Sequence, residues 1–288
     1  MNTVGDVLRA QARDRGAAEF VVSEHERLTY TSAEQRSRAI ARGLLAEGVG
    51  KGARVALLFP TGVSFVVALL AVARIGAVAV PISTFSKPDE LRDLLARSDS
   101  GVLVGVTGHR GNDYVAALRD GCGLDLAAPA PCRSDAVPSL RRVHLEVEGS
   151  ATPGIHADQT VAALLGAGAA VGDALLDAVE ADVAPSDRMV IVHTSGSTSA
   201  PKGVIHEHGP LLRHLENLNS LRGLTAGVRL FSNSPMFWIG GLAYNVLGTF
   251  VAGATLLCPT AVDPADALDF LERAVSYTHL TLPTILRV

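Results

Sequence analysis

The sequence predicts an α/β fold in which mainly parallel strands are covered by helices. Apolar segments with strand character lie at 54–59, 77–82 and 101–106, and segments with helical patterning, 62–75 and 87–98, separate them. Helices of this length between strands form crossover connections, which join parallel strands. A parallel sheet built in this way is covered by helices on both faces.

The starts and ends of the helices carry signals of their own. Thr31 and Glu34 have the spacing of a capping box, which predicts a helix that starts there and that Gly48 can end. Ser86 and Asp89 mark the start of the helix at 87–98 in the same way.

The alternation continues in the second half of the chain. We expect a strand at 141–147, helices at 158–166 and 173–180, and another strand at 189–193. Between the two halves, the Pro- and Ala-rich segment 121–138 predicts a surface connection and not a packed element.

Composition excludes several classes of protein. The chain has 288 residues, 48% of them hydrophobic and 19% charged, with a net charge of −4, which indicates a packed globular protein and excludes a disordered one. The slight acidity and the 5% aromatic content argue against a nucleic-acid partner. Only three residues are lysines, Lys51, Lys87 and Lys202, in a chain that otherwise uses arginine. Each lysine therefore calls for an explanation.

The sequence favours a cytoplasmic location without an integral membrane segment. Its three cysteines, Cys122, Cys132 and Cys258, are odd in number and form no C-x-x-C pair, which is typical of reduced thiols. The N-terminus mixes acids and bases and has no apolar core of the signal-peptide kind. The one long uncharged run, 55–73, is interrupted at 60–62 by Pro-Thr-Gly and predicts a strand, a turn and a buried helix.

A segment rich in hydroxyl groups follows the predicted strand at 189–193. It reads Thr194-Ser-Gly-Ser-Thr-Ser-Ala-Pro-Lys-Gly-Val204. Gly and Ser backbones can turn several N–H groups toward an anion, Ser and Thr hydroxyls can donate to phosphate or ligate a cation, and Lys202 adds a positive charge. This combination predicts a site for a polyphosphate.

Two other interpretations of this segment compete with the first. A solvated Ser/Gly turn with a surface lysine is the bland alternative, but such a turn needs neither Pro201 nor Lys202. The Walker pattern is the closer competitor, but Pro201 stands where it requires Gly, and Gly203 where it requires Ser or Thr. A P-loop nucleotidase is therefore disfavoured.

The segment resembles the signature loop of adenylate-forming enzymes, the superfamily of acyl-CoA synthetases, peptide-synthetase adenylation domains and luciferases. Its usual form there is T-S-G-S-T-G-x-P-K-G-V, and nine of the ten specified positions match. The departure is Ser199 in place of Gly, which disfavours a positive φ and so restricts the mobility of the loop. His208 also follows P-K-G-V at the customary interval.

Further segments resemble successive blocks of the large domain of this family. They are LTY at 28–30, GVGKGARVALLFPTG at 48–62, ARIGAVAVPIST at 73–84 and APSDRMVIVHTSGST at 184–198. SPMFWIGGL at 234–242 resembles the next block, P-x-F-H-x-x-G, in which the aromatic or His residue gates the acid pocket. Trp238 occupies the His position, a variant similar to acyl-CoA ligases for apolar acids, although a core aromatic is the alternative for this residue.

The resemblance implies ATP-dependent activation of a carboxylic acid to an acyl-adenylate, followed by thioester formation with coenzyme A. The acid would be apolar, fatty or aromatic, because the pocket block is apolar. The resemblance also implies the residues involved. The phosphates would be bound by Thr194, Ser195, Gly196, Ser197, Thr198, Ser199, Lys202 and Gly203, with Lys202 and Thr198 catalytic, Thr198 or Ser197 near Mg²⁺, and Trp238, Gly240 and Gly241 shaping the acid pocket.

Relatives in this superfamily continue past the length of this chain, so we expect a truncated form without the small C-terminal domain. Residues 1–185 would form a first α/β region, and 186–288 the phosphate loop and the start of a second. Two alternatives stay open: a catalytically inactive nucleotide-binding fragment, or an adenylation domain that loads a carrier protein.

A metal site at the histidines after the loop is disfavoured. His206 and His208 stand two apart, with His214 further on, and only Glu207 between them could add a ligand. On a strand, Glu207 would point to the opposite face from its two neighbours.

Overall fold

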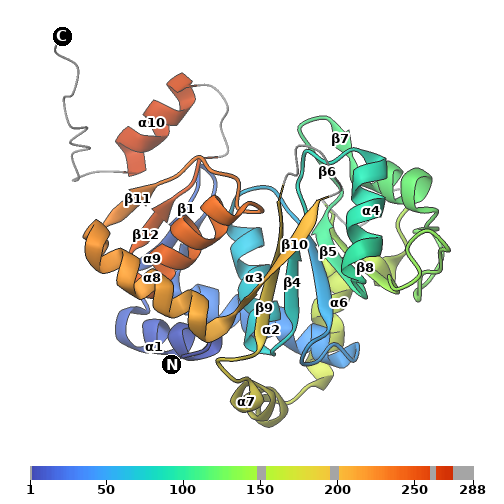
Figure 1. The fold of residues 1–288 in the computed structure, drawn as a ribbon. Helices are drawn as coiled ribbons and strands as arrows, with labels where there is room; N and C mark the ends of the chain where they lie inside the picture. The colour runs from blue at the N-terminus through green and yellow to red at the C-terminus, as the bar shows by residue number, and fades with distance from the viewer. Residues whose placement is uncertain (1, 148–153, 195–200, 260–263, 275–288) are drawn as a thin grey trace.

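The computed structural model describes residues 2–147, 154–194, 201–259 and 264–274, and it shows an α/β fold with two mainly parallel sheets (Figure 1). The larger sheet has six strands in the order β10-β9-β4-β3-β5-β8. Their bounds are β3 (Arg54–Leu58), β4 (Val78–Pro81), β5 (Val102–Val106), β8 (Arg142–Glu146), β9 (Arg188–Thr194) and β10 (Lys202–Glu207). All neighbours in it are parallel except β10, which runs antiparallel to β9. The predicted fold class and the predicted strands of this sheet are confirmed.

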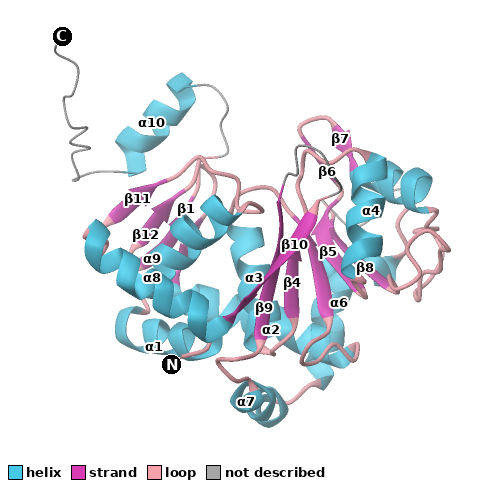
Figure 2. Ribbon diagram, viewed as in Figure 1, coloured by secondary structure: helices cyan, strands magenta, loops and turns pink. Residues whose placement is uncertain are grey.

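The smaller sheet has four strands in the order β11-β12-β1-β2 (Figure 2). They are β1 (Glu19–Val22), β2 (Arg27–Thr29), β11 (Arg229–Phe231) and β12 (Thr255–Leu257). β12 is parallel to both β1 and β11, whereas β2 is antiparallel to β1. Both sheets thus take strands from either side of residue 185, and the division of the chain at that point stays a prediction. A two-stranded hairpin, β6 (Gly108–His109) with β7 (Asn112–Asp113), completes the described β structure.

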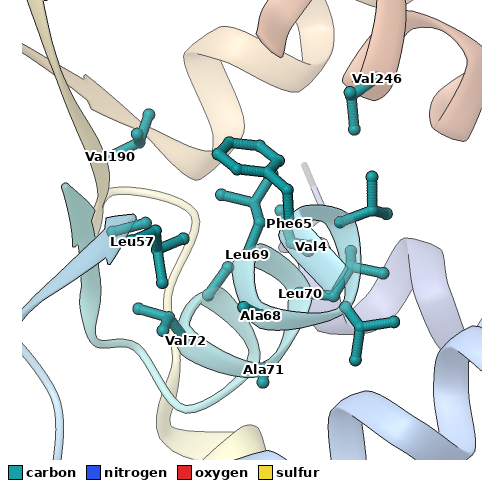
Figure 3. Close-up of a cluster of buried hydrophobic side chains, with 14 of the residues drawn as sticks. Val4, Leu57, Phe65, Ala68, Leu69, Leu70, Ala71, Val72, Val190 and Val246 are labelled. Carbon is teal, nitrogen blue, oxygen red and sulfur yellow. The ribbon is translucent and has the colours of Figure 1, made fainter. Parts of the chain in front are cut away.

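Helix α3 (Val63–Arg74) lies between the two sheets and is buried at every position except Ser64 (Figure 1). Its side chains share one core with Leu57 and Val190 of the larger sheet (Figure 3). Leu256 of the smaller sheet belongs to the same core. Full burial stabilises each large apolar side chain by about 1.5–3 kcal/mol. The uncharged run at 55–73 is therefore a strand, a turn and a core helix, as predicted.

The two faces of the larger sheet pack against different layers. Val55 and Leu57 of β3 join the core around α3, whereas Ala56 and Leu58, which alternate with them, join a second core beneath α4 (Pro88–Ser98). Alternation along a strand places successive side chains on opposite faces. Both faces of the larger sheet are covered, as the sequence predicts.

A buried ion pair connects α3 to the surrounding helices. Arg74 has no exposed side-chain surface, and its guanidinium contacts Glu180 of α7 (Asp173–Asp182) at 2.7 Å and Glu34 of α2 (Tyr30–Ala46) at 2.8 Å. It also donates to the Ser37 hydroxyl at 2.8 Å. Because a buried charge is costly without partners, this set of contacts fixes the positions of the three helices relative to one another.

Two predicted helix starts are displaced. The predicted capping box of Thr31 and Glu34 is wrong: α2 begins at Tyr30, and the Thr29 side chain accepts from the Ser32 N–H. The Glu34 carboxylate is occupied by Arg74, and the Thr31 N–H bonds the Gly16 carbonyl at 3.0 Å. Helix α4 begins after Lys87, whose N–H donates to the Glu90 carboxylate at 2.9 Å, so Ser86 is not its cap.

The connection at 121–138 is irregular in backbone, as predicted, but it is packed, which corrects the expectation of a surface segment. Leu124, Leu126, Cys132 and Val137 are all buried and belong to the core beneath α4. The apolar residues between the prolines and alanines supply this packing.

The described residues form six further α-helices. They are α1 (Val4–Arg15), α5 (Tyr114–Ala116), α6 (Val161–Ala167), α8 (His208–Arg222), α9 (Gly248–Ala252) and α10 (Pro264–Ala274), with π-helical turns at Ala117–Gly121 and Gly240–Leu247 and 3-10 turns at Ala157–Gln159 and Gly168–Ala170. In the described part of the chain no single helix has the length and apolar character to cross a bilayer. One helix pair, 161–170 with 173–182, is long and apolar enough only when its two helices are taken together, and they are bent by 100° relative to each other.

Candidate active site

The ends of the predicted phosphate loop are brought together by the β9–β10 hairpin. Thr194 and Lys202 are directly opposed in this hairpin, and the Thr194 hydroxyl donates to the Lys202 carbonyl at 3.4 Å. β9 runs parallel to β4, so this end of the hairpin lies with the carboxyl ends of the parallel strands. In open α/β sheets, ligands bind in the crevice at that edge.

Six residues of the loop, 195–200, lie outside the described residues. The predicted phosphate ligands Ser195, Gly196, Ser197, Thr198 and Ser199 are among them, as is the predicted Mg²⁺ ligand. Their roles stay predictions, as do those of the described residues Thr194, Lys202 and Gly203.

Beside the hairpin is a cavity of about 460 Å³. Thr194 and Pro201 line it from the two ends of the loop, and Phe237 and Trp238 line it from the segment before the π-helical turn. Helix α4 forms another wall with Glu90, Asp93 and Arg97. The structure thus brings the predicted loop and the predicted acid-pocket segment to one cavity, although about 40 residues of sequence separate them.

Three aromatic rings form the apolar wall of this cavity. The ring of Phe237 lies 5.6 Å from that of Phe85 and 5.3 Å from that of Trp238, both in edge-to-face geometry, and Phe85 lies 6.1 Å from Trp238. Trp238 is 46% exposed and Phe85 is 52% exposed. The core-aromatic alternative for Trp238 is therefore wrong, because half of its surface is open to a ligand. Phe85 carried no sequence signal for this position.

The two glycines after Trp238 differ in what they do. A Cβ on Gly241 would lie 2.1 Å from the Pro235 carbonyl oxygen, so only glycine allows the π-helical turn to pack against the Ser234–Pro235 backbone. A Cβ on Gly240 would meet the Ser234 hydroxyl at 3.5 Å, an ordinary contact. The geometry requires glycine at 241 and not at 240.

His193 is a cavity residue that the sequence analysis did not single out. Its imidazole lines the cavity, burial lowers its pKa, and its Nδ1 atom is buried without a hydrogen-bond partner in the described part of the chain. Gly203 is directly opposite on β10, and a Cβ there would lie 2.7 Å from Ile191 and 3.5 Å from His193 Nε2. Gly203 thus makes room for the Ile191 side chain, whereas a Cβ would make only an ordinary contact with the imidazole. The cross-strand register of the hairpin is the signal that could have identified this pair.

Lys202 and Lys51 have different surroundings. Lys51 forms ion pairs with Asp182 at 3.3 Å and Asp187 at 2.9 Å, which fix the turn before β9. Lys202 is exposed and has no ion pair within the described ranges. Its charge is therefore available to an anion at the hairpin end.

The three histidines that follow the loop diverge. His208 is fully buried at the start of α8, where its Nδ1 accepts from the Val4 N–H at 3.2 Å, and burial lowers its pKa to about 4. A neutral imidazole in this position joins α8 to α1 and does not face the hairpin end. His206 and His214 instead line a separate groove together with Glu207.

Two mainly parallel sheets around one core helix, with Thr194 and Pro201 beside an aromatic cavity, are typical of the N-terminal domain of AMP-binding enzymes. The comparison with known proteins agrees with this class. The chain belongs to the AMP-binding enzyme family, whose sequence model matches residues 8–288. The resemblance drawn from the sequence is confirmed.

Acyl-CoA ligases are among the similar proteins. A Mycobacterium tuberculosis 3-[(3aS,4S,7aS)-7a-methyl-1,5-dioxo-octahydro-1H-inden-4-yl]propanoyl:CoA ligase is 33% identical over 256 residues, which cover 88% of this chain and 46% of that protein. The long-chain-fatty-acid–CoA ligase FadD13 of the same species is 30% identical over 89% of this chain and 45% of its own length. The crystal structure of the N-terminal domain of M. tuberculosis FACL13 superposes with a TM-score of 0.75 at 25% identity, covering 95% of this chain and 61% of that one. The chain spans about half the length of the curated relatives it matches.

Proposed function

We propose that the protein containing this chain activates a carboxylic acid with ATP and transfers the acyl group to coenzyme A, as an acid–thiol ligase. The observation that supports the proposal is the hairpin geometry: Thr194 and Lys202 face each other at one end of β9–β10, and Thr194 lines the same cavity as Trp238. An anion held at this end has the acid-pocket segment beside it. The CoA ligases among the relatives support coenzyme A as the acceptor.

In the first step a carboxylate oxygen attacks the α-phosphorus of ATP, the bond to pyrophosphate breaks, and negative charge grows on pyrophosphate as it leaves. In the second step the thiol of coenzyme A displaces AMP and forms the thioester. Lys202 and the backbone N–H groups of the loop would stabilise the growing charge, because fixed donors gain strength where water is excluded.

Mg²⁺, when bound, would neutralise part of the phosphate charge. Within the described ranges no group of three or more His, Cys, Asp or Glu side chains is placed to hold a metal ion. A Mg²⁺ ion would therefore depend on the loop hydroxyls of Thr198 or Ser197 and on the phosphates themselves.

For the acid we propose a mainly apolar compound, fatty or aromatic, with Trp238, Gly240 and Gly241 shaping its pocket and a role in fatty acid metabolism. The exposed faces of Phe85 and Trp238 support this choice, because a ligand that covers them buries apolar surface. The relatives named above are CoA ligases for a long-chain fatty acid and for a propanoyl acid that carries rings. The absence of a single spanning helix in the described part of the chain is compatible with the cytoplasmic location that we propose.

Nucleotide binding tests the phosphate site directly. We expect Lys202→Ala to weaken ATP binding to this chain by about 1.5–3 kcal/mol, the usual contribution of one charge-assisted contact. Lys87→Ala, at an exposed lysine that begins α4, is the matched control and should bind ATP as the unmodified chain does. Equal ATP affinity in the two variants would remove Lys202 from the site.

Pyrophosphate exchange with a panel of acids separates the proposed reaction from its main alternative. Because the chain spans about half the length of its relatives, it can also be a nucleotide-binding fragment without catalysis. Exchange by a longer version but not by this chain supports the fragment alternative, and exchange by this chain refutes it. Supplying coenzyme A or a carrier protein to the active form then identifies the acceptor.

A further inference from the structure

A second hollow adjoins the acid-pocket segment. Ile239, the neighbour of Trp238, lines a groove of about 400 Å³ between β10 and α8. On β10 the groove begins at Ile205, three residues after Lys202, and a strand rises about 3.3 Å per residue, so the groove starts roughly 10 Å from the lysine. The aromatic cavity and the groove thus adjoin at the neighbouring residues Trp238 and Ile239.

The groove has an apolar floor and apolar walls. Leu211 and Ala243 form the floor and are 7% and 2% exposed. Ile205, Ile239 and Tyr244 form the walls and are 49%, 36% and 42% exposed. Large apolar side chains with this much exposure in one concave place favour an apolar ligand, since covering them contributes about 25 cal/mol per Å².

Three side chains add hydrogen-bonding groups to these apolar walls. They are the imidazoles of His206 and His214 and the phenol of Tyr244, and none of them has a side-chain hydrogen bond or ion pair within the described residues. Burial lowers the pKa of His206, so its imidazole is neutral at pH 7 and offers one donor and one acceptor. Phenol and imidazole N–H groups can donate to a hydroxyl or a keto oxygen of a ligand.

Glu207 restricts which oxygen the groove can accept. Its carboxylate lines the same groove, and it would repel a second carboxylate at the far end of a ligand. A neutral oxygen carries no such penalty. The groove therefore suits a hydrocarbon body with a hydroxyl or keto group and disfavours a dicarboxylic acid.

Resting on the proposed function, we infer that this protein selects acids that carry a neutral oxygen far from the carboxylate, and that His206, His214 and Tyr244 set this preference. The apolar walls hold the body of the acid, and the three polar side chains bind its distal hydroxyl or keto group. An equally long acid without that group leaves their hydrogen bonds unmade.

Calorimetric titration of this chain with octanoate and with ω-hydroxyoctanoate tests the inference. We expect the hydroxy acid to bind about 3- to 10-fold more tightly, as one or two neutral hydrogen bonds contribute. His214→Leu should remove most of this difference. His25→Leu, the same change at an exposed turn outside the groove, is the control and should keep the difference.

Several results would overturn the inference. One is equal affinity for the two acids, and another is an affinity ratio that survives both His214→Leu and Tyr244→Phe. Loss of the preference on Phe85→Ala alone would place the distal oxygen of the acid in the aromatic cavity and not in the groove. Binding of neither acid would also exclude the groove as an acid site.

The ATP titration described above separates this inference from the proposed function. If ATP binds and depends on Lys202 while the chain does not distinguish the two acids, only the inference fails. If ATP does not bind, the proposed function fails, whatever the acids do.

Discussion

Acid should destabilise this fold through one buried histidine. His208 has no exposed surface, its Nδ1 accepts from the Val4 N–H, and its Nε2 has no partner in the described structure. Burial lowers its pKa from 6.5 to about 4, and nearby Asp187 and Asp6 offset this only in part. Between pH 6.5 and about 4, the imidazole of this histidine therefore binds a proton in the unfolded chain but not in the folded one.

The sign and size of the effect follow from this difference. The stabilisation is fully present above pH 6.5 and is lost as the pH falls toward 4, because protonation then favours the unfolded form. At about 1.4 kcal/mol for each pH unit between the two pKa values, the full loss is about 3 kcal/mol. The neighbouring Asp6 and Asp187, whose pKa values are lowered from 3.8, lose their contribution only at lower pH.

Urea denaturation followed by far-ultraviolet circular dichroism at several pH values between 7 and 4 measures this loss. His208→Asn is the informative variant, because its amide oxygen can still accept from the Val4 N–H but does not titrate. Between pH 7 and 4, the variant should lose about 3 kcal/mol less of its unfolding free energy than the unmodified chain does, whatever the effect of the substitution at pH 7. The reasoning is refuted if the unmodified chain and the variant lose stability in parallel.

Three further predictions concern packing. Glu180→Ala should destabilise the fold by about 3–5 kcal/mol, since it removes one carboxylate from the fully buried Arg74. The control is Glu216→Ala on the exposed face of α8, which should change stability little in the same denaturation assay. Gly241→Ala should lower the free energy of unfolding by about 1–3 kcal/mol because the new Cβ would overlap the Pro235 carbonyl. Gly240→Ala should leave it nearly unchanged, and similar melting points for the two variants would contradict the packing described. Gly203→Ala should displace the Ile191 side chain, seen as a change in its methyl resonances by NMR, and unchanged resonances would show that this side chain does not depend on the glycine.

The sequence was sufficient for the five mutually parallel strands of the larger sheet, but not for its antiparallel strand β10 or for the smaller sheet. The strands and helices between 54 and 106 follow from local hydrophobic patterns, and the structure has them within a residue or two. The strands of the smaller sheet are three or four residues long, too short for a pattern, and β1 pairs with β12 across more than 200 residues of sequence. The wrong cap at Thr31 has a similar cause, because Glu34 is taken by Arg74, a partner 40 residues away.

The candidate site divides in the same way. The motif around Lys202 and the aromatic at 238 could be read directly from the sequence, since both are local patterns. The contributions of Phe85 and His193 could not, because they depend on which loop lies beside which strand end. The groove of His206 and His214 likewise exists only once β10 and α8 are packed against the segment after Trp238.

The helix shared by the two sheets has a mechanical consequence. Because α3 is enclosed by both, neither sheet can tilt away from the other without exposing a whole turn of valine, leucine and phenylalanine to water. The strand ends that carry the β9–β10 hairpin therefore have a stiff base.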